Sequence, residues 1–232
     1  MRKHEVQIEI AASPEQVWEA ISTGQGIQSW FCPIASVEPG VGGKTTIKWT
    51  EGMEASPRIE IWEPGRHLQT SSDRPEPGQP NVVDYFIEGS GGTTILRLVH
   101  SGFGDSADFN SEYESTGTAW PVFLNLLKHS VERGVNTCSN VTLFRMIEVP
   151  PATVWEKLAP HVTDRPRYVA PKGHCGCFEL ADSAMLGLFC EKCGGSSMLT
   201  LMQLLYGAPA EQAEAAREHW TGILNQLFGE PK

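Results

Sequence analysis

The chain has 232 residues, of which 40% are hydrophobic and 20% charged, and its formal net charge is −10. This length suffices for one large or two small cores, and the acidic balance argues against nucleic acid or acidic lipid surfaces as partners. No apolar run approaches the ~20 residues of a membrane span, and the N-terminus lacks the uninterrupted apolar stretch of a secretory signal. We therefore expect two small domains in a cytoplasmic protein with neither a nucleic-acid nor a membrane partner.

The first hundred residues alternate polar and apolar side chains in short segments, as antiparallel strands do. After a first strand over residues 6–10, Ser13 is predicted to cap a helix that begins at Pro14, and Gln16 is placed to complete a capping box. Glycine and proline turns then separate strands predicted at 45–50, 58–62, 67–70, 82–88 and 93–100. Residues 73–81 contain three prolines and are predicted to form a surface loop.

A long helix is predicted from Ser111 to Arg133, and the rest of the first half is organised around it. Apolar residues recur there at spacings of three and four, which places on one face Trp120, Phe123, Leu124, Leu127 and Val131. A curved antiparallel sheet that covers this face is the economical way to bury it, so an α+β fold is predicted. A cavity between sheet and helix would then be the natural binding site.

Strand parity indicates which side chains face that cavity. If the charged residues of each strand point to solvent, His100 points inward together with the apolar residues of opposite parity. Such a histidine is either hydrogen-bonded at the edge of the core or orients a ligand, and both interpretations stay open. Buried tryptophans in this region would need hydrogen-bond partners for their indole N–H groups. The candidate ligand-binding residues are Trp30, Phe31, Trp49, Tyr85, Leu98, His100, Trp120, Phe123, Leu124 and Leu127, and no catalytic residue is assigned.

The second half of the chain repeats the first. Residues 86–98, FIEGSGGTTILRL, align without gaps on residues 189–201, FCEKCGGSSMLTL, and both are predicted to be hairpins with a Gly-Gly turn. In the same order, SPEQVW at 13–18 matches PPATVW at 150–155, and WPVFLNLL at 120–127 matches WTGILNQL at 220–227. Three ordered matches indicate a duplicated unit. The second copy is shorter, so we expect it to have lost strands and to have a smaller sheet with a reduced or absent cavity, after a linker at 134–140.

Six cysteines in a chain without a secretory signal favour reduced thiols or a metal site over a disulfide framework. The spacing of Cys175, Cys177, Cys190 and Cys193 could supply four thiolates to zinc. Against this, the repeat places Cys190 inward and Cys193 in a turn, whereas parity with Glu179 predicts that Cys175 and Cys177 point outward. Separate buried or turn thiols are favoured, a zinc site and a labile redox pair stay open, and no cofactor is assigned.

Several motifs together resemble a known family. They are the SPEQVW helix start, GxxxWF at 26–31, WEPGR at 62–66, GGTT at 91–94, VHSGF at 99–103 and WPxxL at 120–124. Over residues 1 to about 135 the chain resembles the family named after the activator of heat-shock protein 90 ATPase, within the START-like or SRPBCC superfamily. The second copy is similar only weakly. The resemblance implies the helix-grip fold, in which a seven-stranded antiparallel sheet wraps a C-terminal helix around a hydrophobic ligand cavity.

We therefore expect a complete helix-grip domain at residues 1–136, followed by a shortened, degenerate repeat at 141–230. The expected function is binding of a hydrophobic small molecule, or of a protein segment, in the cavity. One alternative is an enzyme of the cyclase or hydrolase type that uses His100 or Tyr85 as acid or base. Another is a co-chaperone that activates a heat-shock ATPase through a protein interface. An ionisable group in a closed cavity would favour the enzyme, and an exposed apolar patch the co-chaperone.

Overall fold

The computed structural model describes residues 2–73, 80–90, 92–106, 108–134, 137–162, 165–171 and 174–231. The first unit contains β1 (Arg2–Ile10), α1 (Pro14–Ser22), α2 (Gly24–Gln28), β2 (Ile34–Val37), β3 (Thr45–Thr50), β4 (Met53–Ala55), β5 (Arg58–Glu63), β6 (His67–Ser72), β7 (Asn81–Ser90), β8 (Thr93–Phe103) and α3 (Asp108–Arg133). The second contains β9 (Cys138–Ile147), α4 (Pro151–Leu158), the 3-10 turn η1 (Ala159–His161), β10 (Arg165–Val169), β11 (His174–Glu179), β12 (Met185–Cys193), β13 (Ser196–Tyr206) and α5 (Ala210–Phe228). Within the described ranges, no helix is both long and apolar enough to cross a membrane.

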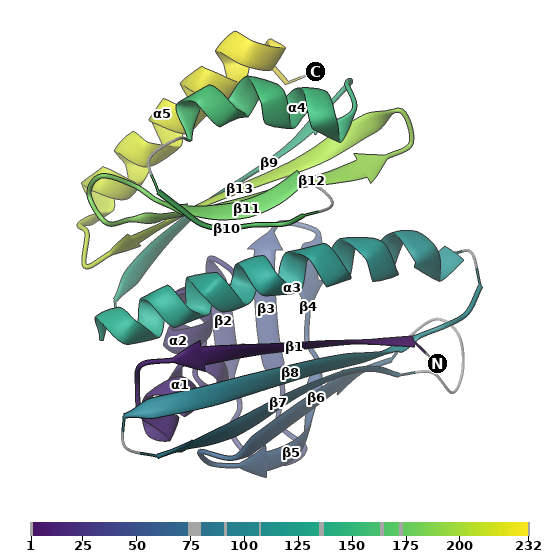
Figure 1. The fold of residues 1–232 in the computed structure, drawn as a ribbon, viewed down its shortest axis with the longest axis vertical. Coiled ribbons are helices and arrows are strands. Elements are labelled where there is room, and N and C mark those ends of the chain that lie inside the picture. Colours follow the sequence, from purple (N-terminus) through teal and green to yellow (C-terminus); the bar gives the residue numbers. More distant parts are fainter. Residues whose placement is uncertain are drawn as a thin grey trace.

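The two units share one sheet topology, which confirms an α+β fold built from a repeated helix-grip unit (Figure 1). Sheet A has the order β1-β8-β7-β6-β5, and sheet C has the equivalent order β9-β13-β12-β11-β10. The aligned hairpins also pair in the same register, since Tyr85 lies opposite Leu98 and Leu188 opposite Leu201.

The expectation of a smaller second sheet is wrong, because sheet C has as many strands as sheet A. The expected loss of strands is nevertheless confirmed, because the described residues of the second copy form no counterpart of α2 or of sheet B, the three-stranded sheet β2-β3-β4. Between α4 and β10, the described residues form only the 3-10 turn η1. The two copies therefore share the five-stranded sheet and differ in the segment between their first helix and the rest of that sheet.

The strands of the first unit divide between sheets A and B, so the single seven-stranded sheet implied by the resemblance is not what forms. A bridge between Lys44 and Arg58 joins the two sheets, together with backbone hydrogen bonds such as Thr45 N–H to Pro57 O at 2.9 Å.

The predicted capping box of α1 is confirmed, because Ser13 and Gln16 each bond the other's backbone. The parity of β8 is also confirmed: Leu96, Leu98 and His100 are buried. The part of the predicted loop at 74–79 and the linker residues 135–136 lie outside the described residues, and β9 already begins at Cys138.

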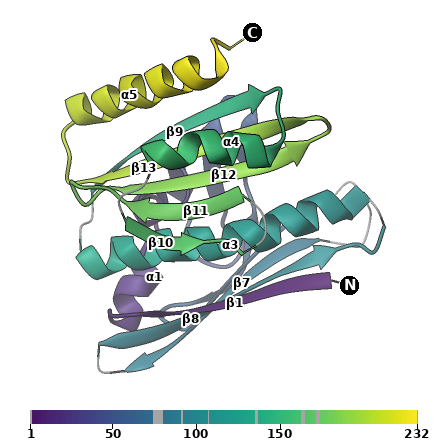
Figure 2. The ribbon, with the colours of Figure 1, turned by 45° about the horizontal axis from the view of Figure 1, so that its top comes forward.

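Helix α3 lies between the two large sheets (Figures 1 and 2). The predicted face, with Trp120, Leu124 and Leu127, is buried in the first unit. Val122 and Leu126 are also 0% exposed. They belong to the same hydrophobic core as Met185, Phe189 and Met202 of the second unit, so this helix is buried on two sides and both units share one core.

Sheet C is consequently covered on both faces, by α3 on one side and by α4 and α5 on the other (Figure 2). The first six residues of strand β12, MLGLFC, are therefore all buried, instead of alternating between buried and exposed side chains. The expectation that Cys175 and Cys177 point outward to solvent is wrong: they are 3% and 0% exposed, because the face that carries them packs against α3.

Candidate functional site

A cavity of about 240 Å³ lies in the first unit, enclosed by sheet A, sheet B and the helices. The concave side of sheet A supplies one wall, α3 a second, and the α1–α2 segment with sheet B the rest. The volume lies just below the ~300–1,000 Å³ usual for ligand pockets, so an occupant would be small. The cavity is lined by Ile21, Ile27, Trp30, Phe31, Thr45, Ile47, Trp49, Ala55, Pro57, Leu68, Thr70, Asn81, Val83, Tyr85, His100 and Trp120.

The structure brings together part of the predicted site. Of the candidate residues, those that line the cavity are Trp30, Phe31, Trp49, Tyr85, His100 and Trp120. Leu98, Leu124 and Leu127 are fully buried in the core and do not line it. Phe123 stacks on Phe189 of the second unit, with ring centroids 4.5 Å apart. A ligand-binding role for the lining residues stays a prediction.

The sequence reasoning missed several lining residues. Leu68 and Thr70 alternate along β6, so the parity argument could have included them. Asn81 begins β7 immediately after the proline-rich loop. Because this residue falls within the predicted loop, the alternation of side chains along a strand was not applied to it. Ile21 and Ile27 come from the two short N-terminal helices, whose packing against sheet B no sequence pattern revealed.

Aromatic rings form a rigid wall. Phe31 lies parallel to Trp120, with centroids 5.8 Å apart, and meets Trp49 edge-on at 5.2 Å. The indole N–H of Trp30 donates to Ala20 O at 3.0 Å, and that of Trp49 donates to Phe31 O at 3.2 Å. The expectation that these indoles need partners is confirmed, and the bonds fix the orientation of the rings.

Both ring nitrogens of His100 are engaged by protein. The indole N–H of Trp120 donates to Nδ1 of His100 at 2.9 Å, and Nε2 of His100 bonds Asn81 Oδ1. An indole nitrogen can only donate, so Nδ1 carries no proton in this arrangement and Nε2 is the donor to Asn81. In the second unit, the indole N–H of Trp220 donates in the same way to Oε1 of Gln203, at 2.7 Å. The repeated bond indicates that His100 holds the helix on the sheet.

Tyr85 differs from His100 in having no such partner. Among the described residues, no group hydrogen-bonds its hydroxyl, although the ring packs edge-on against Trp120 at 6.4 Å. Burial raises the pKa of Tyr85 above its ordinary value, so the phenol stays protonated and can donate a hydrogen bond. Its ring is partly accessible because it borders the cavity. In the equivalent register the second unit has Leu188, so this polar group belongs to the first unit alone.

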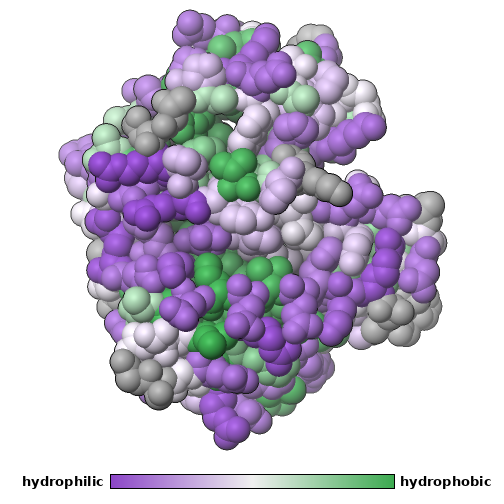
Figure 3. Space-filling view, in the orientation of Figure 1, coloured by the Kyte–Doolittle hydropathy of each residue, from purple (hydrophilic) through white to green (hydrophobic). Residues whose placement is uncertain are grey.

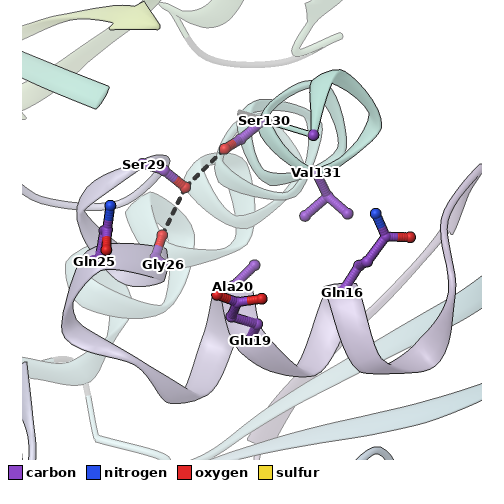
Figure 4. A pocket seen from close by; sticks show the side chains of 9 residues that line it. Gln16, Glu19, Ala20, Gln25, Gly26, Ser29, Ser130 and Val131 are labelled. Carbon is purple, nitrogen blue, oxygen red and sulfur yellow. Dashed lines mark hydrogen bonds between the residues drawn. The ribbon is translucent and has the colours of Figure 1, made fainter. Parts of the chain in front are cut away.

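A different depression lies between α1, α2 and the end of α3 (Figure 4). Ser130 Oγ donates to Ser29 Oγ at 2.7 Å, and Ser29 Oγ donates to Gly26 O at 2.7 Å. These groups satisfy one another, and the depression lacks the aromatic wall of the cavity. It is therefore a weaker candidate for a ligand site.

The four clustered cysteines do not converge on one point. Cys175 and Cys177 face α3, Cys190 packs with the α4 and α5 side of sheet C, and Cys193 is exposed in the hairpin. Burial raises the pKa of Cys177 to about 12 and that of Cys190 to about 11, so these thiols stay neutral. Within the described part of the chain, no three His, Cys, Asp or Glu side chains are grouped to hold a metal ion.

Comparisons with known proteins agree with this architecture. No curated protein matches the chain. A crystal structure of a protein from Mesorhizobium loti is 24% identical with a TM-score of 0.51, covering 57% of this chain and 98% of that one. The Aha1 dimer from Colwellia psychrerythraea is 24% identical with a TM-score of 0.51, covering 58% and 98%. The di-domain ARO/CYC BexL from the BE-7585A biosynthetic pathway is 14% identical with a TM-score of 0.50, covering 100% of both chains.

These similarities show the fold, and the last one extends it over both units. Residues 11–132, more than half of the chain, match the model of the family described as Activator of Hsp90 ATPase homolog 1-like protein, and the chain belongs to this family.

Proposed function

We propose that the chain binds a small, largely apolar molecule in the cavity between sheet A, sheet B and α3. The proposal rests on Tyr85, which lines an aromatic-walled cavity and whose hydroxyl bonds no described group. A phenol hydroxyl both donates and accepts hydrogen bonds, so a group placed in the cavity can bond to it. The ligand that fits is therefore an apolar body, of a size for about 240 Å³, that carries an oxygen able to accept a hydrogen bond.

The repeat supports this assignment. Where the first unit has Tyr85 beside the cavity, the equivalent register of the second unit has Leu188. The cavity-lining Asn81 begins β7, whereas the residue that aligns with it, Ala184, precedes β12. The segment that walls the cavity in the first unit, α2 with sheet B, also has no counterpart among the described residues of the second unit. Polar side chains and enclosing segment thus occur together, as expected if they serve the same ligand.

An enzyme remains the second candidate, because BexL is described as an ARO/CYC and has a similar fold over the whole chain. His100 is poorly placed as a base, since both ring nitrogens already have partners. Tyr85 is better placed to donate a hydrogen bond to a carbonyl oxygen on which negative charge develops. A co-chaperone role has less support: the exposed large hydrophobic residues of the described chain lie on separate segments, at Ile34, Val41, Met146 and Val169.

The test compares two ligands of equal shape. Acetylnaphthalene offers a carbonyl acceptor and ethylnaphthalene does not, and each is used to displace the apolar dye N-phenylnaphthylamine. We expect the parent to prefer acetylnaphthalene about fivefold to tenfold, the usual value of one hydrogen bond. Tyr85→Phe should abolish the preference. Tyr113→Phe is the matched control, because the Tyr113 hydroxyl donates to Lys3 O at 3.2 Å outside the cavity.

Two outcomes would refute the proposal. One is that neither naphthalene displaces the dye from the parent protein, and the other is that the Tyr85→Phe variant keeps the parent's preference for acetylnaphthalene. Native mass spectrometry of freshly purified protein complements the test. A co-purifying small molecule that Tyr85→Phe loses would identify the natural ligand.

A further inference from the structure

A larger groove separates the two units beside the N-terminal half of α3. Its volume is about 990 Å³. Ser115 and Thr118 of α3 form one side, and Pro151 of α4 with Cys175 and Glu191 of sheet C form the other. Figure 3 shows a notch on the right of the molecule, where α3 extends beyond the strands of the second unit in Figure 1. The groove is distinct from the cavity, with which it shares no lining residue.

Glu191 is the unusual residue of the groove. It follows Phe189 by two positions on β12 and therefore lies on the face of sheet C that packs against α3. Its side chain is half-buried, and no ion pair or hydrogen bond joins it to another described residue. The equivalent residue of the first hairpin, Glu88, is exposed. The same sequence position thus meets solvent in one copy and a partly enclosed groove in the other.

A half-buried carboxyl without a partner is poorly solvated when it ionises, and burial raises the pKa of Glu191 accordingly. A cation brought next to it would compensate for the lost hydration. A second carboxyl, on the exposed Glu114, borders the same groove. The lysine that lines the groove, Lys192, is exposed at its rim. The other titratable groups that line the groove are His174 and the neutral thiols of Cys175 and Cys190.

We propose that this groove is a second ligand site, which binds an amphipathic amine. The apolar body of the ligand lies against Pro151 and the groove-lining thiols of Cys175 and Cys190, and its ammonium group contacts the Glu191 carboxylate. The chain's net charge of −10 attracts such a cation as it approaches. This site is independent of the cavity in the first unit.

The probe is dansylcadaverine, a fluorescent apolar ring on an alkyl chain that ends in a primary amine. Its acetylated form keeps the same body without the charge. We expect the full-length parent to bind the amine at least about tenfold more tightly than the acetylated form, which is the effect of one charge-assisted hydrogen bond. Glu191→Gln should remove most of that difference. Glu88→Gln, the same change at the exposed counterpart, should leave it intact, as should Tyr85→Phe in the cavity.

Equal binding of the amine and its acetylated form would overturn the proposal, and this comparison needs no variant. A Glu191→Gln protein that is folded by circular dichroism and still prefers the amine would overturn it as well. Loss of the preference in Tyr85→Phe, with Glu191→Gln unaffected, would place the amine in the cavity and also refute the groove site.

Discussion

The Trp120 indole N–H donates to Nδ1 of His100 at 2.9 Å, and it is this bond that joins α3 to the inner face of sheet A. Because Gln203 accepts the equivalent bond from Trp220 at 2.7 Å, a glutamine is expected to replace the histidine without loss. We predict that His100→Gln changes the free energy of unfolding by less than about 1 kcal/mol. His100→Phe leaves a buried indole N–H unpaired and should cost about 1–3 kcal/mol. Urea unfolding followed by circular dichroism distinguishes the two, and equal stabilities would show that the bond contributes nothing.

Two helical glycines should respond oppositely to alanine. A Cβ at Gly117 of α3 would lie 2.5 Å from Cε1 of His4, whose ring is stacked on Tyr113 and cannot easily move. A Cβ at Gly222 of α5 meets nothing within 4 Å. We predict that Gly117→Ala destabilises by about 1–3 kcal/mol through overpacking, whereas Gly222→Ala stabilises by up to about 1 kcal/mol through helix propensity. Thermal unfolding of both variants checks this, and a stabilising Gly117→Ala would mean that His4 is free to shift.

The shared core can be tested by cutting the chain. A fragment of residues 1–136 retains sheets A and B with α3, and we expect it to fold, but with Val122 and Leu126 uncovered. Leu126→Ala should therefore cost about 2–5 kcal/mol in the full chain and less than about 1 kcal/mol in the fragment. Leu124→Ala, on the face toward sheet A, should be costly in both. A fragment that is molten or aggregated would instead show that the core of the first unit is not stable without the second.

The raised pKa of Glu191 predicts a pH dependence of stability. The folded state holds this proton more tightly than the unfolded chain, so the favourable contribution is complete below the ordinary carboxyl pKa and is lost as pH rises through the folded pKa. At neutral pH the ionised carboxylate of Glu191 therefore destabilises the folded state. Glu191→Gln should melt at a higher temperature than the parent at pH 7, and the difference should vanish well below the ordinary carboxyl pKa. A difference that grows with acidity would mean that the assigned direction is wrong.

Much of the fold follows from local patterns. The capping box at Ser13, the parity that turns His100 inward and the register shared by the two hairpins depend on neighbours in sequence, and all three are confirmed. The strands at Ile34–Val37 and Met53–Ala55 were not predicted, because four and three residues carry too little alternation to distinguish strand from turn.

The second buried side of α3 also has a signal in the sequence. Residues 122–127 read VFLNLL, so this part of the helix is apolar nearly all round, which is typical of a helix covered on more than one side. What covers it depends on how the second unit docks, and sequence periodicity does not specify that. The unpartnered hydroxyl of Tyr85 and the half-buried carboxyl of Glu191 are likewise products of tertiary packing, since the chemically identical Glu88 is exposed.

Helix α3 also sets an order of events during synthesis. Its side that faces sheet C is complete on the ribosome once Arg133 has been made, but the strands that cover it extend from Cys138 to Tyr206. At roughly 5–20 residues per second, those strands take about 3–14 s to be translated. During that interval Val122 and Leu126 of the nascent chain lack the strands that cover them in the folded protein. Burial of this side of α3 is therefore complete only after β13 has been translated.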